Sequence, residues 1–387
     1  MLRDLSAIKE FILSGERIGE ILQLPCETWI LIDGIVNNEN LHVLDYKVVY
    51  RGEVECSSKD LNDPFDFTLR YFEYTRVPRF FKVLRTTSLI SMIIRRILTS
   101  RMFTELPPPV IGWKSDPGLR GAVKAKIVLY GKEYEVHSSL IMYKQIYASI
   151  FEKIFYFARN VRIEPTENAY TGRHLVEFTQ VDVEQAFTTP EDSMNTAETL
   201  LKEVIREFLN QQEDLIERNR AEWLEKTFLS GRFPRISYEE ACDFLIRKGF
   251  KVRKGKELSH EAEVYLGKVF EQPVWLTSFP SESRGFYYLE DPSRPGYNVD
   301  WNLITTDGEI LDGGCREYHA EKIVKKIEAS GENPADYKWF LELVSKKLVK
   351  PTCGWGLGLE RFVKIINGLE HIAFATAHPR IPGLLGP

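Results

Sequence analysis

The chain has 387 residues, enough for one large domain with a small appendage. Its net charge of −5 and pI of about 5.9 provide no overall basic field of the kind that nucleic-acid-binding proteins display. No apolar run approaches membrane-spanning length and the N-terminus is charged, so the sequence predicts a cytoplasmic protein with no membrane partner.

The cysteines give no sign of a disulfide framework or a zinc site. There are five of them, at positions 26, 56, 242, 315 and 353, and none forms a C-x-x-C pair. An odd number without such spacing is typical of reduced cytosolic thiols, and that is the state the sequence predicts.

Residues 1–70 are predicted to form a small α/β extension of a main domain at 71–387. Residues 1–24 show a broken apolar periodicity that predicts a short amphipathic helix, and 28–56 alternate like about three strands, too few for an OB barrel. Residues 1–76 carry 8 basic and 14 acidic side chains, a net charge of −6, which disfavours an RNA-binding module. The extension is therefore interpreted as an acidic docking or dimer-stabilising segment.

The main domain begins with helix and hairpin patterns. Apolar residues at helical spacing predict a helix from Thr86, ended by the proline run 107–109. Residues 126–136 predict a hairpin with Gly131 in its turn. A second helix, preceded by two serines that can cap it, is predicted over 140–155.

Residues 160–187 predict a second hairpin with an unusual returning strand. Alternation places Phe178, Gln180 and Asp182 together on one face, while Arg162 lies on the outgoing strand. A solvated sheet face is the commoner reason for such alternation. An aromatic side chain among the polar ones favours a binding surface instead.

Helices and a third hairpin follow. Helical periodicity over 192–229 predicts one long helix, and 237–266 have the pattern of an ordinary helix–strand–helix cover layer. The third hairpin is predicted to turn at 305–308. Glu309 and Asp312, three residues apart beside glycines, are interpreted as a Mg²⁺ pair for a phosphate-bearing substrate. An acidic surface hairpin is the alternative.

The segment 350–364, KPTCGWGLGLERFVK, is the most distinctive in the chain. Gly354, Gly356 and Gly358 alternate with large apolar residues, so a strand here exposes bare backbone on one face. A flat ligand such as a purine fits against that strip, and Arg361 follows where the strand is expected to turn into a helix. The alternative is a glycine-rich strand packed closely against another element.

Together these features suit ATP bound in a bent form across a sheet. The side chains expected to bind it are Arg162 at the α-phosphate, Phe178 and Arg361 around the adenine, Arg173 and His174 at the outer phosphates, and Glu309 with Asp312 at the metal. The chemistry implied is attack of a carboxylate on the α-phosphorus, giving an acyl-adenylate and pyrophosphate. Positioning and charge neutralisation supply the rate without a nucleophilic side chain.

Several of these segments resemble one family. NVRIEP…GRHLVEFTQVDVE and GWGLGLER closely resemble motifs 2 and 3 of class II aminoacyl-tRNA synthetases of the aspartyl/asparaginyl subgroup, and GEILDGGCRE resembles the subgroup's G-E-I…G-x-x-R segment. The first helix with FTELPPPVI resembles motif 1, which implies a homodimer through the helix and strand between Thr86 and Ile111. The resemblance runs from about Phe72 to the C-terminus. It implies an α+β fold with a six-stranded antiparallel sheet flanked by helices.

The resemblance also implies roles for individual side chains. It makes Arg162, Arg316 and Arg361 the catalytic residues. The ATP-binding residues are then Arg162, Glu164, Arg173, His174, Phe178, Glu309, Gly356, Gly358 and Arg361. The amino acid is expected to be held by Lys144 and Arg316 at its distal carboxylate or amide, by Gln180 and Asp182 at its ammonium, and by Asp116 on a loop that closes over it.

Three departures from the synthetase pattern stand out. Ile141 replaces a glutamine that helps to fix the amino acid, Asp312 stands where a small residue is common, and the OB anticodon-binding domain is missing or reduced. With the segments RPGYN and GGCREY, these departures are similar to the archaeal asparagine synthetases related to asparaginyl-tRNA synthetase.

The favoured hypothesis from the sequence is synthesis of asparagine from aspartate, ATP and ammonia with Mg²⁺, releasing AMP and pyrophosphate. Because Arg316 and Lys144 can grip either carboxylate of aspartate, both orientations stay open. A second hypothesis is a truncated asparaginyl- or aspartyl-tRNA synthetase that activates the α-carboxylate and charges tRNA. A third is a non-catalytic, synthetase-like nucleotide-binding regulator. The acidic N-terminal segment and the missing barrel favour the first.

Overall fold

The computed structural model describes residues 2–3, 8–9, 12–25, 27–37, 40–52, 62–75, 77–116, 122–211 and 215–386. The chain divides into two compact units, Met1–Asp63 and Pro64–Pro387, each with its own hydrophobic cluster. None of the described helices is long and apolar enough to cross a membrane.

The first unit is built on a small sheet. Its strands, in spatial order, are β3 (Ile12–Ser14), β5 (Asn40–Tyr50) and β4 (Trp29–Asn37). The helix α1 (Ile18–Leu22) packs Ile21 against Leu41 and Val43 of β5. The strands predicted for 28–56 are confirmed between 29 and 50, but there they are two, β4 and β5, rather than about three, and the end of the segment at 53–56 lies outside the described residues.

The amphipathic helix predicted for residues 1–24 is wrong. Among the residues described there, β1 (Leu2–Arg3), β2 (Ile8–Lys9) and β3 are strands, and α1 alone is helical. Ile12 and its neighbours pair in parallel with the start of β5, at Asn40. Backbone pairing with a distant strand has overridden a weak and broken helical periodicity.

The second unit is organised by a large sheet. Within the described residues its eight strands are, in spatial order, β12 (Arg235–Ser237), β13 (Val274–Thr277), β14 (Asp300–Thr305), β15 (Gly308–Cys315), β16 (Thr352–Gly358), β11 (Glu177–Ala186), β10 (Lys153–Val161) and β6 (Thr104–Glu105). The six from β13 to β10 are antiparallel neighbours, which confirms the predicted fold. The edge strands β12 and β6 add parallel pairs.

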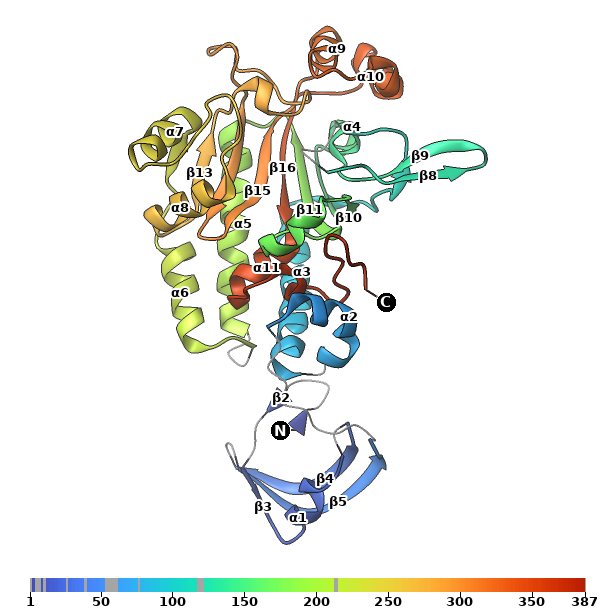
Figure 1. Ribbon diagram of the computed structural model, residues 1–387, viewed down its shortest axis with the longest axis vertical. Helices are drawn as coiled ribbons and strands as arrows, with labels where there is room; N and C mark the ends of the chain where they lie inside the picture. The colour runs from blue at the N-terminus through green and yellow to red at the C-terminus, as the bar shows by residue number, and fades with distance from the viewer. Residues whose placement is uncertain are drawn as a thin grey trace. The chain divides into compact units, whose positions relative to one another are not determined.

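Helices cover this sheet. They are α2 (Pro64–Tyr74), α3 (Pro78–Ser100), α4 (Ile141–Phe151), α5 (Pro190–Gln211), α6 (Arg218–Leu229), α7 (Tyr238–Arg247), α8 (His260–Phe270), α9 (Ala320–Ala329), α10 (Lys338–Ser345) and α11 (Leu359–Asn367). A small sheet of β7 (Ile111–Gly112), β9 (Lys132–Val136) and β8 (Lys126–Leu129) contains the predicted hairpin. Figure 1 shows the large sheet between α7 and α8 on one flank and α4 with this hairpin on the other.

Several helix boundaries differ from the prediction. The helix expected from Thr86 begins at Pro78, because a proline in the first turn needs no N–H partner. The helix expected over 140–155 ends at Phe151, where Glu152 adopts a φ of 65° and β10 begins. The long helix expected over 192–229 is two helices, α5 and α6, and 212–214 between them lie outside the described residues.

Candidate functional site

One face of the central sheet collects the polar side chains that the sequence singled out. Asp182 of β11 is the register partner of Tyr156 on β10 and of Gly356 on β16. Gly356 is in turn the partner of Asp312 on β15. Because register partners in adjacent strands point to the same side of a sheet, residues from four strands meet on one surface.

Four buried ionic side chains form the floor of this surface. Lys144 of α4 donates to Asp182 at 2.7 Å, and its Nζ lies 3.9 Å from Glu184. Arg316 binds Glu184 through two nitrogens, Nε at 3.0 Å and Nη2 at 3.1 Å. All four side chains are at most 1% exposed, so two cations and two anions balance in a region that excludes water. We call this set the charged floor.

Burial and charge shift the pKa values of the charged floor in opposite senses. Burial raises the pKa of Asp182, and Lys144 beside it lowers that pKa only in part. Burial works to lower the pKa of Arg316, but the Glu184 carboxylate more than offsets it, and the Arg316 pKa lies above its usual value.

The charged floor also holds two unmatched polar atoms. Within the described part of the chain, Arg316 Nη1 and Asp182 Oδ2 are buried and have no hydrogen-bond partner. An unmatched buried donor or acceptor costs about 1–3 kcal/mol. A bound ligand that carries both an acceptor and a donor group would satisfy the two atoms.

The glycines of β16 leave space that side chains of the neighbouring strand β11 fill. A Cβ at Gly354 would stand 2.0 Å from Glu184 Oε2, and one at Gly356 would stand 2.1 Å from Gln180 Nε2. At Gly358 the nearest neighbour is Arg361, at an ordinary 3.6 Å. The strip of backbone predicted to receive a purine is therefore covered by β11 side chains at its first two glycines, and is open beside Arg361.

Arg162 lies against Phe178, and Arg361 lies against the start of β15. The Arg162 guanidinium is 5.1 Å from the centre of the Phe178 ring, and its Nε donates to Ser138 O at 3.2 Å. Arg361 Nη1 donates to the backbone oxygen of Glu309 at 2.9 Å. One of the two arginines expected to flank the ligand is thus in contact with the expected aromatic platform.

The pKa of His174 reflects its burial and the positive charges of three arginines. Burial lowers its pKa to about 3, and the charges of Arg173 and Arg361 add to the effect, with Arg162 contributing last. His174 Nδ1 shares a hydrogen bond with Thr171 Oγ1 at 2.7 Å, so the ring is held and neutral. Such a group of cations around a neutral imidazole suits a polyanion.

The start of α11 is fixed by a buried carboxylate. Both oxygens of Glu360 accept from the Thr179 backbone N–H, at 2.9 and 3.0 Å. This bond ties the helix to β11 and directs the next residue, Arg361, toward Glu309 and Arg173. The turn from strand to helix that the sequence predicted is confirmed, with Gly358 preceding α11.

The two carboxylates of the predicted metal pair have different direct partners, which Arg284 links, since its Nη2 donates to Asn302 at 3.1 Å as well as to Asp312. Asp312 is held by Arg284 at 2.5 Å and by the Tyr288 hydroxyl on its other oxygen. Glu309 instead accepts from Asn302 at 3.0 Å. No group of three or more His, Cys, Asp or Glu side chains in the described ranges is placed to hold a metal. With both oxygens of Asp312 already bonded, Glu309 and Asp312 do not fit as a paired Mg²⁺ site.

Two other predicted site residues are bonded within the protein. Asp116 accepts from Ser138 at 2.8 Å through one oxygen and pairs with Lys124 at 2.8 Å through the other, so both its carboxylate oxygens already have partners. Residues 117–121, the loop expected to close over an amino acid, lie outside the described residues. Glu164 accepts from Asn168 at 2.8 Å, at the start of the loop that carries Arg173 and His174.

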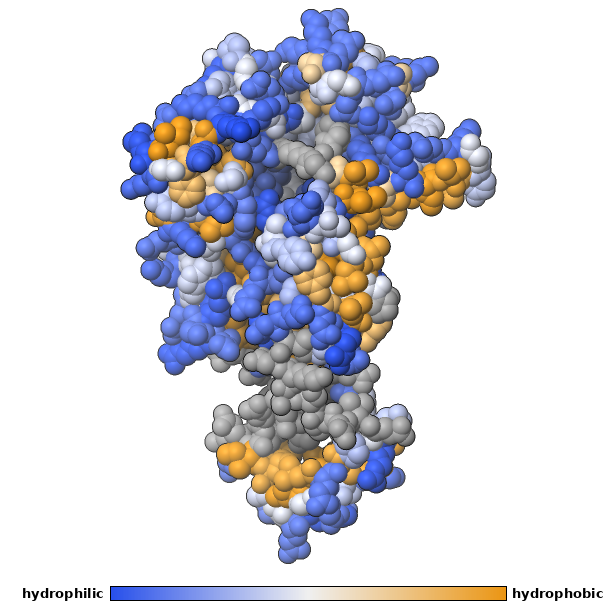
Figure 2. Space-filling model, viewed as in Figure 1, coloured by the Kyte–Doolittle hydropathy of each residue, from blue (hydrophilic) through white to orange (hydrophobic). Residues whose placement is uncertain are grey.

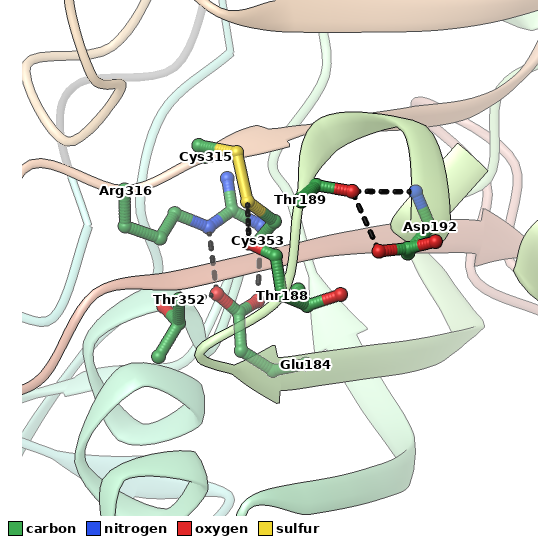
Figure 3. The surroundings of a disulfide bond; sticks show 8 residues. All are labelled: Glu184, Thr188, Thr189, Asp192, Cys315, Arg316, Thr352 and Cys353. Atoms are coloured by element: carbon green, nitrogen blue, oxygen red, sulfur yellow. Dashed lines mark hydrogen bonds and ion pairs between the residues drawn. A yellow bond between two sulfur atoms is a disulfide. The ribbon is translucent and has the colours of Figure 1, made fainter.

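A disulfide joins β15 and β16 beside the charged floor. Cys315 and Cys353 are register partners with Cα atoms 3.9 Å apart, and each precedes or follows a residue bonded to Glu184, namely Arg316 and Thr352. Figure 3 shows the Glu184 side chain, on β11, close to Arg316 and Thr352. The prediction of reduced thiols is therefore wrong for this pair, because strand register joins cysteines that sequence spacing left unrelated. Cys242 is free and buried, and Cys26 and Cys56 lie outside the described residues.

Breaking this disulfide is expected to lower the free energy of unfolding by about 2–4 kcal/mol, since it closes a loop across 38 positions. Urea denaturation with and without dithiothreitol measures the difference. The double variant Cys315→Ala/Cys353→Ala is the control: it should begin at the lower stability and be insensitive to the reductant. Equal midpoints for the oxidised and reduced wild-type protein would contradict the prediction.

Three side chains of the site were missed in the sequence. Glu184 follows the predicted face of β11 by two residues, so extending the alternation of 178, 180 and 182 would have found it. His260 and Glu263 lie on α8, which was taken for an ordinary cover layer. Their spacing of three is common on any helix, so no signal in the sequence distinguished them.

Comparisons with known proteins agree on one family. The profile described as tRNA synthetases class II (D, K and N) matches residues 62–382. An asparagine–tRNA ligase of Pyrococcus furiosus is 31% identical over 410 aligned residues, covering 100% of this chain and 91% of that protein. An aspartate–tRNA(Asp/Asn) ligase of Methanopyrus kandleri is 33% identical over 300 residues, 77% of this chain and 67% of the other.

A solved structure extends the likeness to the fold. The asparaginyl-tRNA synthetase of Pyrococcus horikoshii, determined with asparaginyl-adenylate, superposes with a TM-score of 0.88 at 27% identity. The match covers 100% of this chain and 91% of that chain, so it includes the acidic N-terminal unit as well as the large sheet.

Proposed function

We propose, because this chain belongs to the class II tRNA synthetases of the D, K and N group, that it activates asparagine with ATP and transfers it to tRNA. The family makes the protein an adenylate-forming ligase that uses ATP. The choice of asparagine and of tRNA as acceptor rests on the charged floor and on the names of the relatives.

The ammonia-dependent synthesis of asparagine favoured by the sequence is wrong. The argument for it was the acidic N-terminal segment without a full barrel, yet relatives named asparagine–tRNA ligases align over the entire chain, that segment included. An acidic, small N-terminal unit therefore does not separate this chain from tRNA-charging enzymes. Of the two other hypotheses, the tRNA synthetase fits better than the regulator.

The observation that carries the choice of amino acid is the charge balance of the floor. Arg316 is already neutralised by Glu184, and Lys144 by Asp182. A carboxylate side chain, as in aspartate, would add an uncompensated negative charge beside Glu184, whereas a carboxamide adds none. The carbonyl oxygen of asparagine is a suitable acceptor for Arg316 Nη1, and its ammonium a suitable donor to Asp182 Oδ2.

Activation then needs only binding and charge. The α-carboxylate of asparagine attacks the α-phosphorus of ATP, forming asparaginyl-adenylate and releasing pyrophosphate. Arg162 is assigned to the α-phosphate, and Phe178 with Arg361 to the adenine. Arg173 and His174 are assigned to the outer phosphates. Since Glu309 and Asp312 do not fit as a metal pair, the charge neutralisation is assigned to these cationic side chains.

The third substrate is tRNA, whose terminal ribose hydroxyl would attack the adenylate carbonyl. The test is a pair of assays on the purified protein: amino-acid-dependent exchange of labelled pyrophosphate into ATP, and charging of transcribed tRNA(Asn). Asparagine should support exchange about 100-fold better than aspartate, because one site must reject a buried unpaired charge. Preference for aspartate would favour an aspartyl enzyme, and no exchange with either amino acid would end the proposal.

We also propose a homodimer through α3 and the segment that follows it. Large apolar side chains are exposed there, including Met92 at 64%, Met102 at 81% and Val110 at 54%. Exposed apolar groups of this number are typical of a subunit interface. Sedimentation equilibrium at micromolar concentration should give about twice the chain mass of 44.9 kDa. A mass of one chain would contradict it.

A further inference from the structure

Helix α8 contributes two polar side chains, His260 and Glu263, that have no role in the proposed activation step. His260 Nδ1 accepts from Arg173 Nη1 at 2.8 Å. Glu263, one turn along, lies 3.6 Å from the same nitrogen and accepts from the Glu309 backbone N–H at 3.2 Å. Arg173 is thus held from α8, more than 80 positions away in the sequence.

Two glycines allow α8 to come this close. A Cβ at Gly267 would stand 2.0 Å from the backbone oxygen of Thr305, so the helix rests directly on the turn between β14 and β15. Gly308 has a φ of +85°, and a Cβ there would stand 2.8 Å from His260 Nδ1 and 3.2 Å from Glu263 Oε2. The helix is therefore seated so that His260 and Glu263 lie against this turn, beside Glu309.

The charges around Arg173 leave its cation available. Burial, with the positive charge of Arg173 next, lowers the pKa of His260 to about 4, so the ring is neutral at pH 7 and accepts the hydrogen bond without compensating the charge. Arg173 itself is 25% exposed at its side chain and has Arg361 near it. Its pKa is lowered by burial and by Arg361, which means that a second anion would be favourable there.

We propose that His260 and Glu263 are positioning residues that hold Arg173 over the outer phosphates of ATP. His260 fixes one nitrogen of the guanidinium, and Glu263 ties the same nitrogen to the turn that carries Glu309. The remaining guanidinium donors are then directed toward the β- and γ-phosphates. The inference rests on the proposed function for the identity of the nucleotide, but not for the choice of amino acid or tRNA.

The experiment compares ATP with AMP, which lacks the outer phosphates. Isothermal titration of His260→Ala without amino acid should show ATP binding weakened about 10-fold and AMP binding changed less than about twofold. His260→Asn, which offers an amide oxygen near the position of Nδ1, should restore most of the ATP affinity. Lys268→Ala, an exposed change farther along α8, is the control and should alter neither nucleotide.

His260→Phe and Glu263→Gln complete the design. Phenylalanine keeps a ring in the same space but has no hydrogen-bond acceptor, so His260→Phe should weaken ATP binding as His260→Ala does. It replaces the alanine variant if that variant does not fold. Glutamine at 263 should weaken ATP more than AMP. Equal losses for ATP and AMP, or unchanged ATP affinity in the His260 variants, would overturn the inference. Because nucleotide titration needs no amino acid, a wild-type protein without asparagine-dependent exchange would end the proposed function and leave this result standing.

Discussion

Arg162→Ala is expected to slow asparagine-dependent ATP–pyrophosphate exchange about 10²–10³-fold, with a much smaller change in the KM for asparagine. Its guanidinium lies beside Phe178 and is steadied by the Ser138 backbone oxygen, at the place assigned to the α-phosphate. Negative charge grows there as the carboxylate attacks, so the arginine contributes more to the transition state than to ground-state binding. Steady-state exchange rates over a range of ATP and asparagine concentrations separate the two effects.

The matched control is Arg159→Ala, in β10, the strand that ends just before Arg162. Arg159 is an exposed arginine of β10 that bonds to Glu177 and, at 3.0 Å, to Thr179, away from the assigned phosphate position. Its loss removes the same charge from the protein and should change the exchange rate by less than about threefold, as expected of a surface ion pair. Similar losses in both variants would show that general charge, rather than position, is what the assay reports.

The large sheet was predictable because its strands have strong local signals. The alternating glycines of 354–358 and the antiparallel hairpins each specify their own geometry, and the resemblance to the family ordered them. Helix ends were less predictable. Ile150, Phe151, Ile154 and Phe155 continue one helical spacing in the sequence, and only the pairing of β10 with β11 decides where the helix stops.

The predicted site residues that lie on strands were easier to find than their partners. Register brings Phe178, Asp182 and Gly356 to one face, as alternation indicates. The side chains that bind the site's arginines were harder to find. Glu184, which binds Arg316, continues strand β11, but His260 binds Arg173 from a helix whose sequence gives no sign of function. Contacts between distant elements depend on tertiary packing, which periodicity does not report.

Two of the predictions that differ from the structure, the metal pair and the reduced thiols, do so for one reason. Asp312 and the two cysteines on β15 and β16 were judged by their spacing along the chain. Asp312 is bonded to Arg284 across the sheet face, and Cys315 is joined to Cys353 on the next strand. The chemistry of a carboxylate or a thiol depends on the side chain that the fold places against it. Spacing along the chain does not report that side chain, so it predicted a metal ligand at Asp312 and free thiols at the two cysteines.

Glu184→Gln is expected to change which amino acid the site accepts. Glutamine keeps the shape and can still bond to Arg316, but it removes the negative charge that neutralises this buried guanidinium. The floor then carries one excess positive charge, which a carboxylate side chain compensates and a carboxamide does not. The ratio of kcat/KM for aspartate to that for asparagine should rise about 10- to 100-fold, the effect of one charged hydrogen bond gained or lost. Exchange assays with each amino acid measure it.

The control is Glu177→Gln, an exposed carboxylate on the same strand that pairs with Arg159. It removes one negative charge from β11 without touching Arg316, so the aspartate-to-asparagine ratio should stay within about twofold of the wild type. Glu184→Gln is also expected to be less stable, because the guanidinium and its neighbour Lys144 are then opposed by Asp182 alone. A thermal midpoint lowered without any change in the ratio would mean that Glu184 only supports the fold. If the variant is folded and the ratio of kcat/KM for aspartate to that for asparagine has risen, the charge of Glu184 determines which amino acid the site accepts.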